Sequence, residues 1–220
     1  MNIKYLKYIL GAACICLLLQ NSILMEPAWA QDETAAADEA ADADDSGPEP
    51  LTEEEMEILV ARIALYPDEL VAVISGASLY PLEVVEASRF LDKYEKDNSL
   101  EPDPDWDGSI ISLLNYPEIV TMMSDDLDWT QSLGDALAYQ QEDVLIAIQQ
   151  LREQAVADGI IESDDKMEVV EEDDNIVINS TSTETVYVPQ YEPEMLYTST
   201  YAPAPVSYYP NPYPRYYYPG

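Results

Sequence analysis

Residues 64–92 read ALYPDELVAVISGASLYPLEVVEASRFLD, and this stretch decides the fold class of the chain. A Tyr-Pro pair precedes an acidic and aliphatic run here twice, and a looser copy follows downstream: Tyr66-Pro67, Tyr80-Pro81 and Tyr116-Pro117. Proline is favoured at the first position of a helix, because the N–H that it lacks would have no helical partner there. Acidic side chains in the next turn interact favourably with the helix dipole. The repeat therefore predicts a series of short helices that begin at these prolines.

The helical pattern extends over residues 51–161. Thr52 followed by Glu55 is a capping box, in which each residue satisfies an early backbone N–H of the other. Apolar residues then recur at helical spacing. The predicted helices are 52–65, 67–78, 81–96, 107–115, 117–124, 126–139 and 141–158. A segment of this length can bury a core, so we expect a compact multi-helix domain.

A short β region is predicted over residues 162–197. Strand-like runs lie at 167–170 and 176–178, on either side of a polar turn, and a third lies at 185–188, where Pro189 stops it. Isolated strands of this length are marginal in water, so we expect a small β-hairpin or meander that docks on the helices. The fold class is mainly α.

Two flanking segments have the composition of disordered chain. Residues 31–50 contain Ala, Asp and Glu with no basic and no large apolar residue, which predicts a disordered acidic linker. Residues 198–220 form a Tyr/Pro-rich tail that we expect to be extended and unpacked, because proline favours polyproline II and removes ladder donors. The tail is either a low-complexity spacer or a segment that docks on a partner protein, on glycan or on another copy.

Residues 1–30 are predicted to be a signal peptide. Lys4 and Lys7 precede an apolar run, and Ala28-Trp29-Ala30 is a small-x-small cleavage pattern before Gln31. An uncleaved membrane anchor and a lipoprotein linked through Cys14 are the alternatives. The unbroken apolar run is short for a membrane span. We expect an exported protein of the periplasm or cell envelope, with no transmembrane segment after cleavage.

Composition excludes several classes of function. The chain contains no histidine, and its two cysteines, Cys14 and Cys16, would leave with the signal peptide. The mature chain would then lack a disulfide, a thiol nucleophile, an imidazole base and a Cys/His metal site. The net charge of −35 argues against nucleic acid as a partner. The acidic surface either attracts cations and basic partners or is a solvated coat.

Six segments stand in order along the chain: ALYPDELVA (64–72), SLYPLEVVEASRFL (78–91), WDGSIISLLNYPEI (106–119), DLDWTQSLGDA (126–136), QQEDVLIAIQQLREQA (140–155) and VYVPQYEP (186–193), which contains Tyr187 and Pro189. Together and in register they resemble the domain-of-unknown-function family numbered 3300, found in exported bacterial proteins. The resemblance implies an envelope protein that is helical and then β, with no established activity and no catalytic residues to transfer. The short tail without histidine departs from family members with longer tails.

A partial calcium-loop pattern lies between two of the predicted helices. Asp103, Asp105 and Asp107 alternate as oxygen ligands, and Gly108 would allow the sharp turn. The closing bidentate Glu of such a loop would fall at position 114, which is Leu114. The alternative is that Asp107 caps the following helix. Calcium is the one cofactor that the sequence suggests.

Acidic and aromatic side chains leave two further interpretations open. Carboxylate pairs could form a hydrolase acting on envelope glycan, but such a site needs one carboxyl with a raised pKa and another nearby, and spacing does not show this. Trp106, Trp129 and the tyrosines of the Tyr-Pro pairs either fix helix starts in the core or line a ligand groove. We therefore predict a non-enzymatic interaction or scaffolding module, with an envelope protein or glycan as partner. The carboxylate hydrolase and weak calcium binding are the alternatives.

Overall fold

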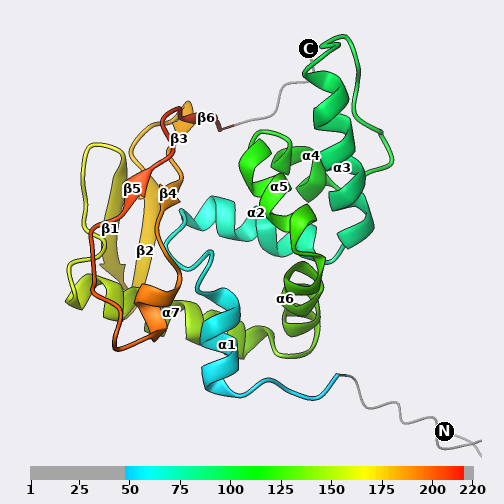
Figure 1. The fold of residues 1–220 in the computed structure, drawn as a ribbon. Coiled ribbons are helices and arrows are strands. Elements are labelled where there is room, and N and C mark those ends of the chain that lie inside the picture. Colours follow the sequence, from blue (N-terminus) through cyan, green and yellow to red (C-terminus); the bar gives the residue numbers. More distant parts are fainter. Residues whose placement is uncertain (1–47, 216–220) are drawn as a thin grey trace, which may run out of the picture. The chain divides into compact units, whose positions relative to one another are not determined.

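The computed structural model describes residues 48–215. The predicted signal peptide, the acidic linker up to residue 47 and residues 216–220 lie outside the described part. The helices are α1 (Glu53–Val60), α2 (Asp68–Ser78), α3 (Pro81–Tyr94), α4 (Gly108–Leu113), α5 (Pro117–Asp125), α6 (Leu127–Tyr139), α7 (Gln141–Ala157) and α8 (Glu194–Tyr197). The strands are β1 (Met167–Glu172), β2 (Asn175–Ser180), β3 (Thr185–Val186), β4 (Pro189–Gln190), β5 (Ser207–Tyr208) and β6 (Tyr213–Pro214). The predicted class is confirmed: a mainly helical chain followed by short antiparallel strands (Figure 1).

The helix starts follow the local signals. The Thr52 Oγ1 accepts the Glu55 N–H at 3.3 Å, and the Glu55 carboxylate accepts the Thr52 N–H at 2.9 Å, so the capping box forms. Pro81 and Pro117 are the first residues of α3 and α5. Pro67 is the N-cap of α2 and not its first residue, a shift of one residue from the prediction.

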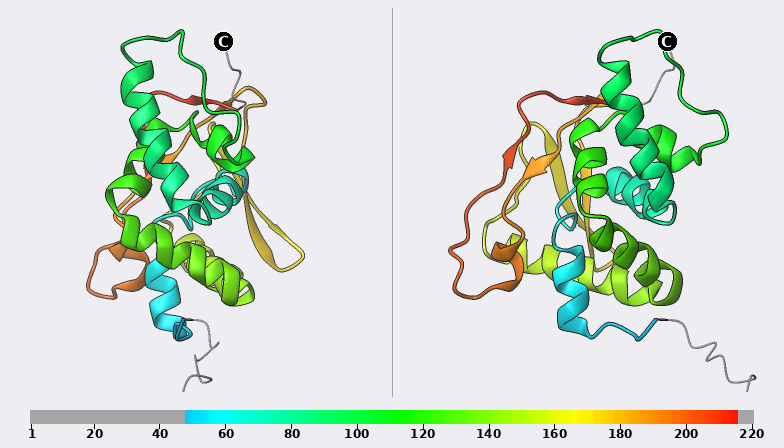
Figure 2. Two further views of the ribbon diagram at one scale, coloured as in Figure 1. Left: turned by 90° about the vertical axis from the view of Figure 1, so that its right-hand side faces the viewer. Right: turned by 45° about the vertical axis from the view of Figure 1, so that its right-hand side comes forward.

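Helix α2 packs against α3, α4 and α6, while α1 packs along α7. The approach of α6 to the end of α2 is close at Gly134, where a Cβ atom would lie 2.4 Å from the Ser78 carbonyl oxygen. The large side chains that are fully buried in this core include Met56, Ile63, Leu65, Leu70, Ile74, Ile110, Leu113, Ile119, Met123 and Leu133. Figure 2 shows the strands beside the helices α2 to α6, with α7 running past both groups.

Strands β1 and β2 form the predicted hairpin, with Glu172 paired to Asn175 at its end. Asp173 and Asp174 have positive φ angles of 49° and 64°, which the primed turns of two-residue hairpins require. Side chains bond part of each edge of the hairpin. On β1 the Ser163 hydroxyl bonds both the N–H and the carbonyl of Val169, and on β2 the Gln149 amide accepts the Ile176 N–H. Backbone groups bonded in this way are not free to pair with a further strand.

The predicted third strand and the predicted unpacked tail need correction. Residues 185–188 do not continue the hairpin as a meander. Instead β3 pairs with β6, and β4 begins at Pro189 and pairs with β5. We call residues 206–215 the strap. The strap is largely extended, as the Tyr/Pro composition predicts, but it packs on the domain, because tyrosines supply large contact areas with a polar tip and Tyr213 is buried.

Within residues 48–215, no single helix is long and apolar enough to span a membrane. Taken together, helices α2 and α3 have the length and composition of a membrane span, but they are bent by 111° at the break between them.

Candidate functional site

The turn between α1 and α2, residues 61–66, is held by side chains from distant parts of the chain. The sequence predicts helix through residue 65, but α1 ends at Val60. The Tyr191 hydroxyl donates to the Ala61 carbonyl at 2.8 Å and accepts the Leu65 N–H at 3.3 Å. Burial, followed by the neighbouring Tyr66, raises the pKa of Tyr191 well above its ordinary value. This hydroxyl therefore stays protonated and continues to donate its hydrogen bond.

Arg152 of α7 holds the same turn from the other side. Its side chain is buried and donates to three carbonyls, those of Ala64 at 2.7 Å, Tyr66 at 3.1 Å and Ile176 at 2.8 Å. It also forms an ion pair with Asp68 at 2.6 Å. The sequence analysis missed this residue. Its position four residues after Ile148, on the apolar stripe of the helix, is the signal that could have revealed it.

Next to this turn lies a groove of about 640 Å³, which we call the tyrosine groove. Its walls come from the turn, from β4 and the segment after it, and from the strap; the lining residues include Arg62, Tyr66, Gln190, Tyr191, Pro193 and Tyr209. The rings of Tyr66 and Tyr191 meet edge to face, with centroids 6.2 Å apart and an interplanar angle of 80°. Arg62 is half-exposed, pairs with Asp126 at 2.8 Å and lies over the Trp129 ring.

The tyrosine groove has the chemistry of a recognition surface. Burial raises the pKa of Tyr66 as well, with a smaller contribution from Tyr209, so both tyrosines at its base are neutral. Flat aromatic faces, prolines and a few hydrogen-bonding tips suit an extended polypeptide or a sugar ring. The serine that lines it, Ser207, donates its hydroxyl to the Gln190 carbonyl at 3.2 Å, whereas a nucleophilic serine needs a hydrogen bond to a base.

A second groove of about 870 Å³, the acidic groove, lies between α7 and residues 195–203. Glu57, Glu153 and Asp158 contribute carboxylates to it, and Tyr201 contributes an exposed ring. Burial is the main cause that raises the pKa of Glu57, and repulsion by the neighbouring acidic residues of α1 adds to it.

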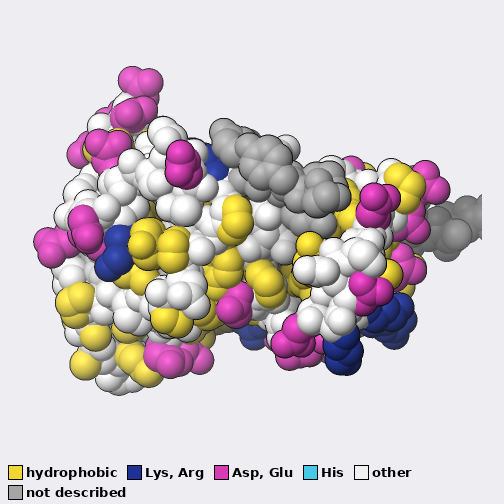
Figure 3. Space-filling view, turned by 90° about the horizontal axis from the view of Figure 1, so that it is seen from above, with side chains coloured by type: hydrophobic (Ala, Val, Ile, Leu, Met, Phe, Trp, Pro, Cys, Tyr) yellow, Lys and Arg dark blue, Asp and Glu magenta, His cyan; other side chains and the backbone are white. Residues whose placement is uncertain are grey.

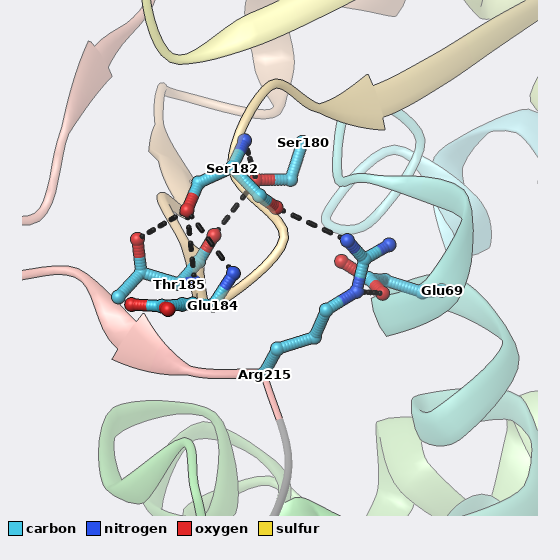
Figure 4. Close-up of polar contacts among 6 residues, drawn as sticks. All are labelled: Glu69, Ser180, Ser182, Glu184, Thr185 and Arg215. Atoms are coloured by element: carbon cyan, nitrogen blue, oxygen red, sulfur yellow. Dashed lines mark hydrogen bonds and ion pairs between the residues drawn. The ribbon is translucent and has the colours of Figure 1, made fainter.

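The end of the strap is fixed by a polar cluster around Arg215 (Figure 4). The Arg215 Nε lies 2.7 Å from the Glu69 carboxylate, and its Nη1 donates to the Ser182 carbonyl at 3.0 Å. The Ser182 hydroxyl accepts backbone N–H groups from Glu184 and Thr185. It therefore shapes a turn, and no base lies beside it to activate it as a nucleophile.

The aromatic residues singled out in the sequence occupy different sites. The indole of Trp129 donates to the Leu59 carbonyl at 2.8 Å, and that of Trp106 donates to Glu86 at 3.1 Å. Tyr116 is buried against Tyr213 of the strap, with centroids 5.3 Å apart. Burial, and then the Glu69 carboxylate, raises the pKa of Tyr116 to about 12.

The other two predicted tyrosines lie elsewhere. Tyr80 is exposed at the bend between α2 and α3. Tyr187 packs edge to face on Tyr208, and the Lys166 ammonium lies over both rings. The structure thus brings Tyr66 to the tyrosine groove, places Tyr116 and Tyr187 against the strap, and leaves Tyr80 apart.

The three carboxylates of the predicted calcium loop do not converge. Asp103 accepts the Asp105 N–H at 3.0 Å, and Asp107 accepts both the N–H and the hydroxyl of Ser109, which caps α4. In the part of the chain that the structure describes, no group of three or more acidic, His or Cys side chains could hold a metal ion. Calcium binding stays a prediction, for which this geometry offers no prepared site.

Comparison with known proteins identifies a family. The family model described as "Protein of unknown function (DUF3300)" matches residues 52–220. The chain is also 34% identical over 120 residues to "Uncharacterized protein YacH" of Escherichia coli (strain K12). That match covers 50% of this chain but only 19% of YacH, so the chain corresponds to a minor part of its relative. No solved structure matches.

Proposed function

This chain belongs to the DUF3300 family of proteins of unknown function, and from that premise we propose that it is an exported cell-envelope module that binds partners and catalyses no reaction. The signal-like pattern of residues 1–30 supports export. The absence of histidine from the sequence removes the commonest general base. The net charge of −35 makes nucleic acid an unsuitable ligand.

The observation that carries the proposal is the tyrosine groove. Its aromatic and proline walls resemble the grooves that bind extended, proline-rich polypeptide, a conformation that loses little entropy on binding. The same face already binds one such segment, since Ser207 and Tyr208 of the strap pair with Pro189 and Gln190 of β4. We therefore assign the groove to an extended Pro- or Tyr-containing segment of an envelope protein.

A photo-crosslinking amino acid in intact cells tests this assignment. It replaces Gln190, an exposed residue that lines the groove, and in a matched control it replaces Leu145, which is exposed on α7. Adducts should form from position 190 but not from position 145, and Tyr209→Ser should reduce them because it removes a wall of the groove. Equal capture from both positions would refute the proposal.

A second candidate is the carboxylate hydrolase acting on envelope glycan. The raised pKa of Glu57, in the acidic groove that also contains Glu153 and Asp158, is the observation that favours it. A hydrolase of this kind needs a protonated carboxyl as its acid. Purified protein should then release fragments from isolated envelope glycan, and Glu57→Gln should abolish the release. Glycan that stays intact with the unmodified protein excludes this candidate.

A further inference from the structure

The strap lies on a surface that is built by earlier parts of the chain. Its backbone N–H groups at Val206, Tyr209 and Arg215 donate to the carbonyls of Ile160, Val188 and Glu184, at 3.0, 3.2 and 2.9 Å. Its side chains add the Tyr208 hydroxyl on Asp164 at 2.8 Å and the Arg215 ion pair with Glu69 at 2.7 Å. All these partners precede the strap by at least 21 residues in sequence, as Val188 does for Tyr209, so the seat of the strap does not depend on the segment that leads into it.

The connection to the strap is weakly held. Residues 199–205 are all exposed and have no regular helix or strand, and they include Pro203 and Pro205. Prolines stiffen such a segment towards an extended conformation, which opposes tight folding back. The two ladders that the strap forms are two residues long each. A short segment held by short ladders can detach from the domain without unfolding the helical core.

We propose that the strap is exchanged between two copies of this chain. In the exchanged dimer, Tyr213 of each copy would pack against Tyr116 of the other, and Arg215 would pair with the other copy's Glu69. The contacts are the same in both forms, so the balance depends on the concentration of the protein relative to the effective concentration of the tethered strap, which is in the ~mM range for short linkers.

The partner is a second copy because the surface under the strap fits the side chains of the strap itself. Unseating the strap would expose the buried face of Tyr116 and leave Glu69 without its cation. The strap of a second copy restores both the aromatic contact and the charge pair. Exchange would also complete the tyrosine groove in trans, because Ser207 and Tyr209 line that groove. The inference goes beyond the proposed function, since it holds whatever ligand the groove takes.

Cysteine pairing in the full chain tests the exchange. Cys14 and Cys16, the two native cysteines, are first replaced by serine. One tagged variant carries Thr185→Cys and a second carries Pro214→Cys, at positions that face each other in the β3–β6 ladder. The two are mixed, unfolded and refolded together at ~1 mM, comparable to the effective concentration, or at ~1 µM, far below it. They are then oxidised. A 185–214 disulfide between chains forms only if one copy's strap lies on the other copy's β3.

The control pair combines Thr185→Cys with Leu145→Cys, since Leu145 is exposed on α7 and away from the strap ladders. We expect far more 185–214 heterodimer than control heterodimer after refolding at the high concentration, and equal traces at the low one. A chain carrying both cysteines should close the bond internally at low concentration, which verifies folding and register. The inference is wrong if the 185–214 heterodimer never exceeds the control, or if the double variant does not close.

Discussion

Replacing Arg152 with methionine should strongly destabilise the domain. The substitution removes the donors to the carbonyls of Ala64 and Tyr66, whereas the Ile176 carbonyl keeps a bond from Gln149 at 3.4 Å. Each buried carbonyl left without a donor costs about 1–3 kcal/mol. The Asp68 side chain is 43% exposed, but the Oδ1 that pairs with Arg152 is itself buried and has no other partner in the described part of the chain, so losing the ion pair adds to this cost.

Methionine matches the helix propensity of arginine and fills part of the vacated volume. Helix propensity and lost packing therefore add little to the loss of stability. The two orphaned carbonyls alone then give an expected loss of about 2–6 kcal/mol in the free energy of unfolding. Lysine at position 152 keeps the charge but not the planar guanidinium group, which reaches several carbonyls at once. The stability of Arg152→Lys should therefore lie between that of the unmodified protein and that of Arg152→Met.

Urea unfolding followed by circular dichroism measures these differences, with the midpoint and slope compared between variants. The matched control is Arg62→Met, because Arg62 forms a half-exposed ion pair with Asp126, and such pairs contribute about 0–1 kcal/mol. If Arg152→Met costs no more than Arg62→Met, the buried network around Arg152 does not stabilise the first Tyr-Pro turn.

Three further outcomes follow from the geometry. Gly134→Ala should destabilise the protein by about 1–3 kcal/mol, because the new Cβ meets the Ser78 carbonyl of a neighbouring helix. Gly108→Ala, with open space around its Cβ, should not; chemical unfolding compares the two. Hydrogen bonds from the Ser109 hydroxyl and then from its backbone N–H lower the pKa of Asp107 in the folded protein. The ionised carboxylate therefore stabilises the fold above its unfolded pKa of about 3.9. This stabilisation is lost as pH falls through the lowered pKa of the folded state. The stability difference between the unmodified protein and Ser109→Ala should therefore shrink as pH falls below about 4, and a difference that stays constant there would contradict this. Because Asp107 is used as a helix cap, millimolar calcium should leave the melting temperature unchanged; a clear rise would restore the calcium loop.

The helical part of the fold was predictable because its signals are local. The Thr52 capping box, the prolines at the starts of α3 and α5, and the polar turn at 173–174 each act within a few residues of the chain. Hydrogen bonds and φ angles at these positions depend on neighbours in sequence. The observed helices accordingly lie close to the predicted ranges, and the hairpin forms where the pattern indicates it.

The parts that were not predicted depend on partners far away in sequence. Residues 61–65 have helical propensity, but Tyr191 and Arg152 bond the carbonyls there, so the chain leaves the helix after Val60. The strap has the composition of a disordered tail, yet Tyr213 is buried and Arg215 finds Glu69, 146 residues away. Composition predicts the extended conformation of such a segment, but it does not reveal the surface on which the segment packs.

The three Tyr-Pro pairs share one local sequence signal but differ in their tertiary contacts. Each pair lies at the start of a helix, but only two of the tyrosines contact the C-terminal third of the chain: Tyr66 meets Tyr191, and Tyr116 meets Tyr213. Tyr80 is 40% exposed, beside the exposed Leu79 and Leu82. Since all three share the sequence pattern, the pattern itself cannot be the binding site. It sets where helices begin, and contacts from residues 189–215 then give two of those starts, at Tyr66 and Tyr116, their distant neighbours.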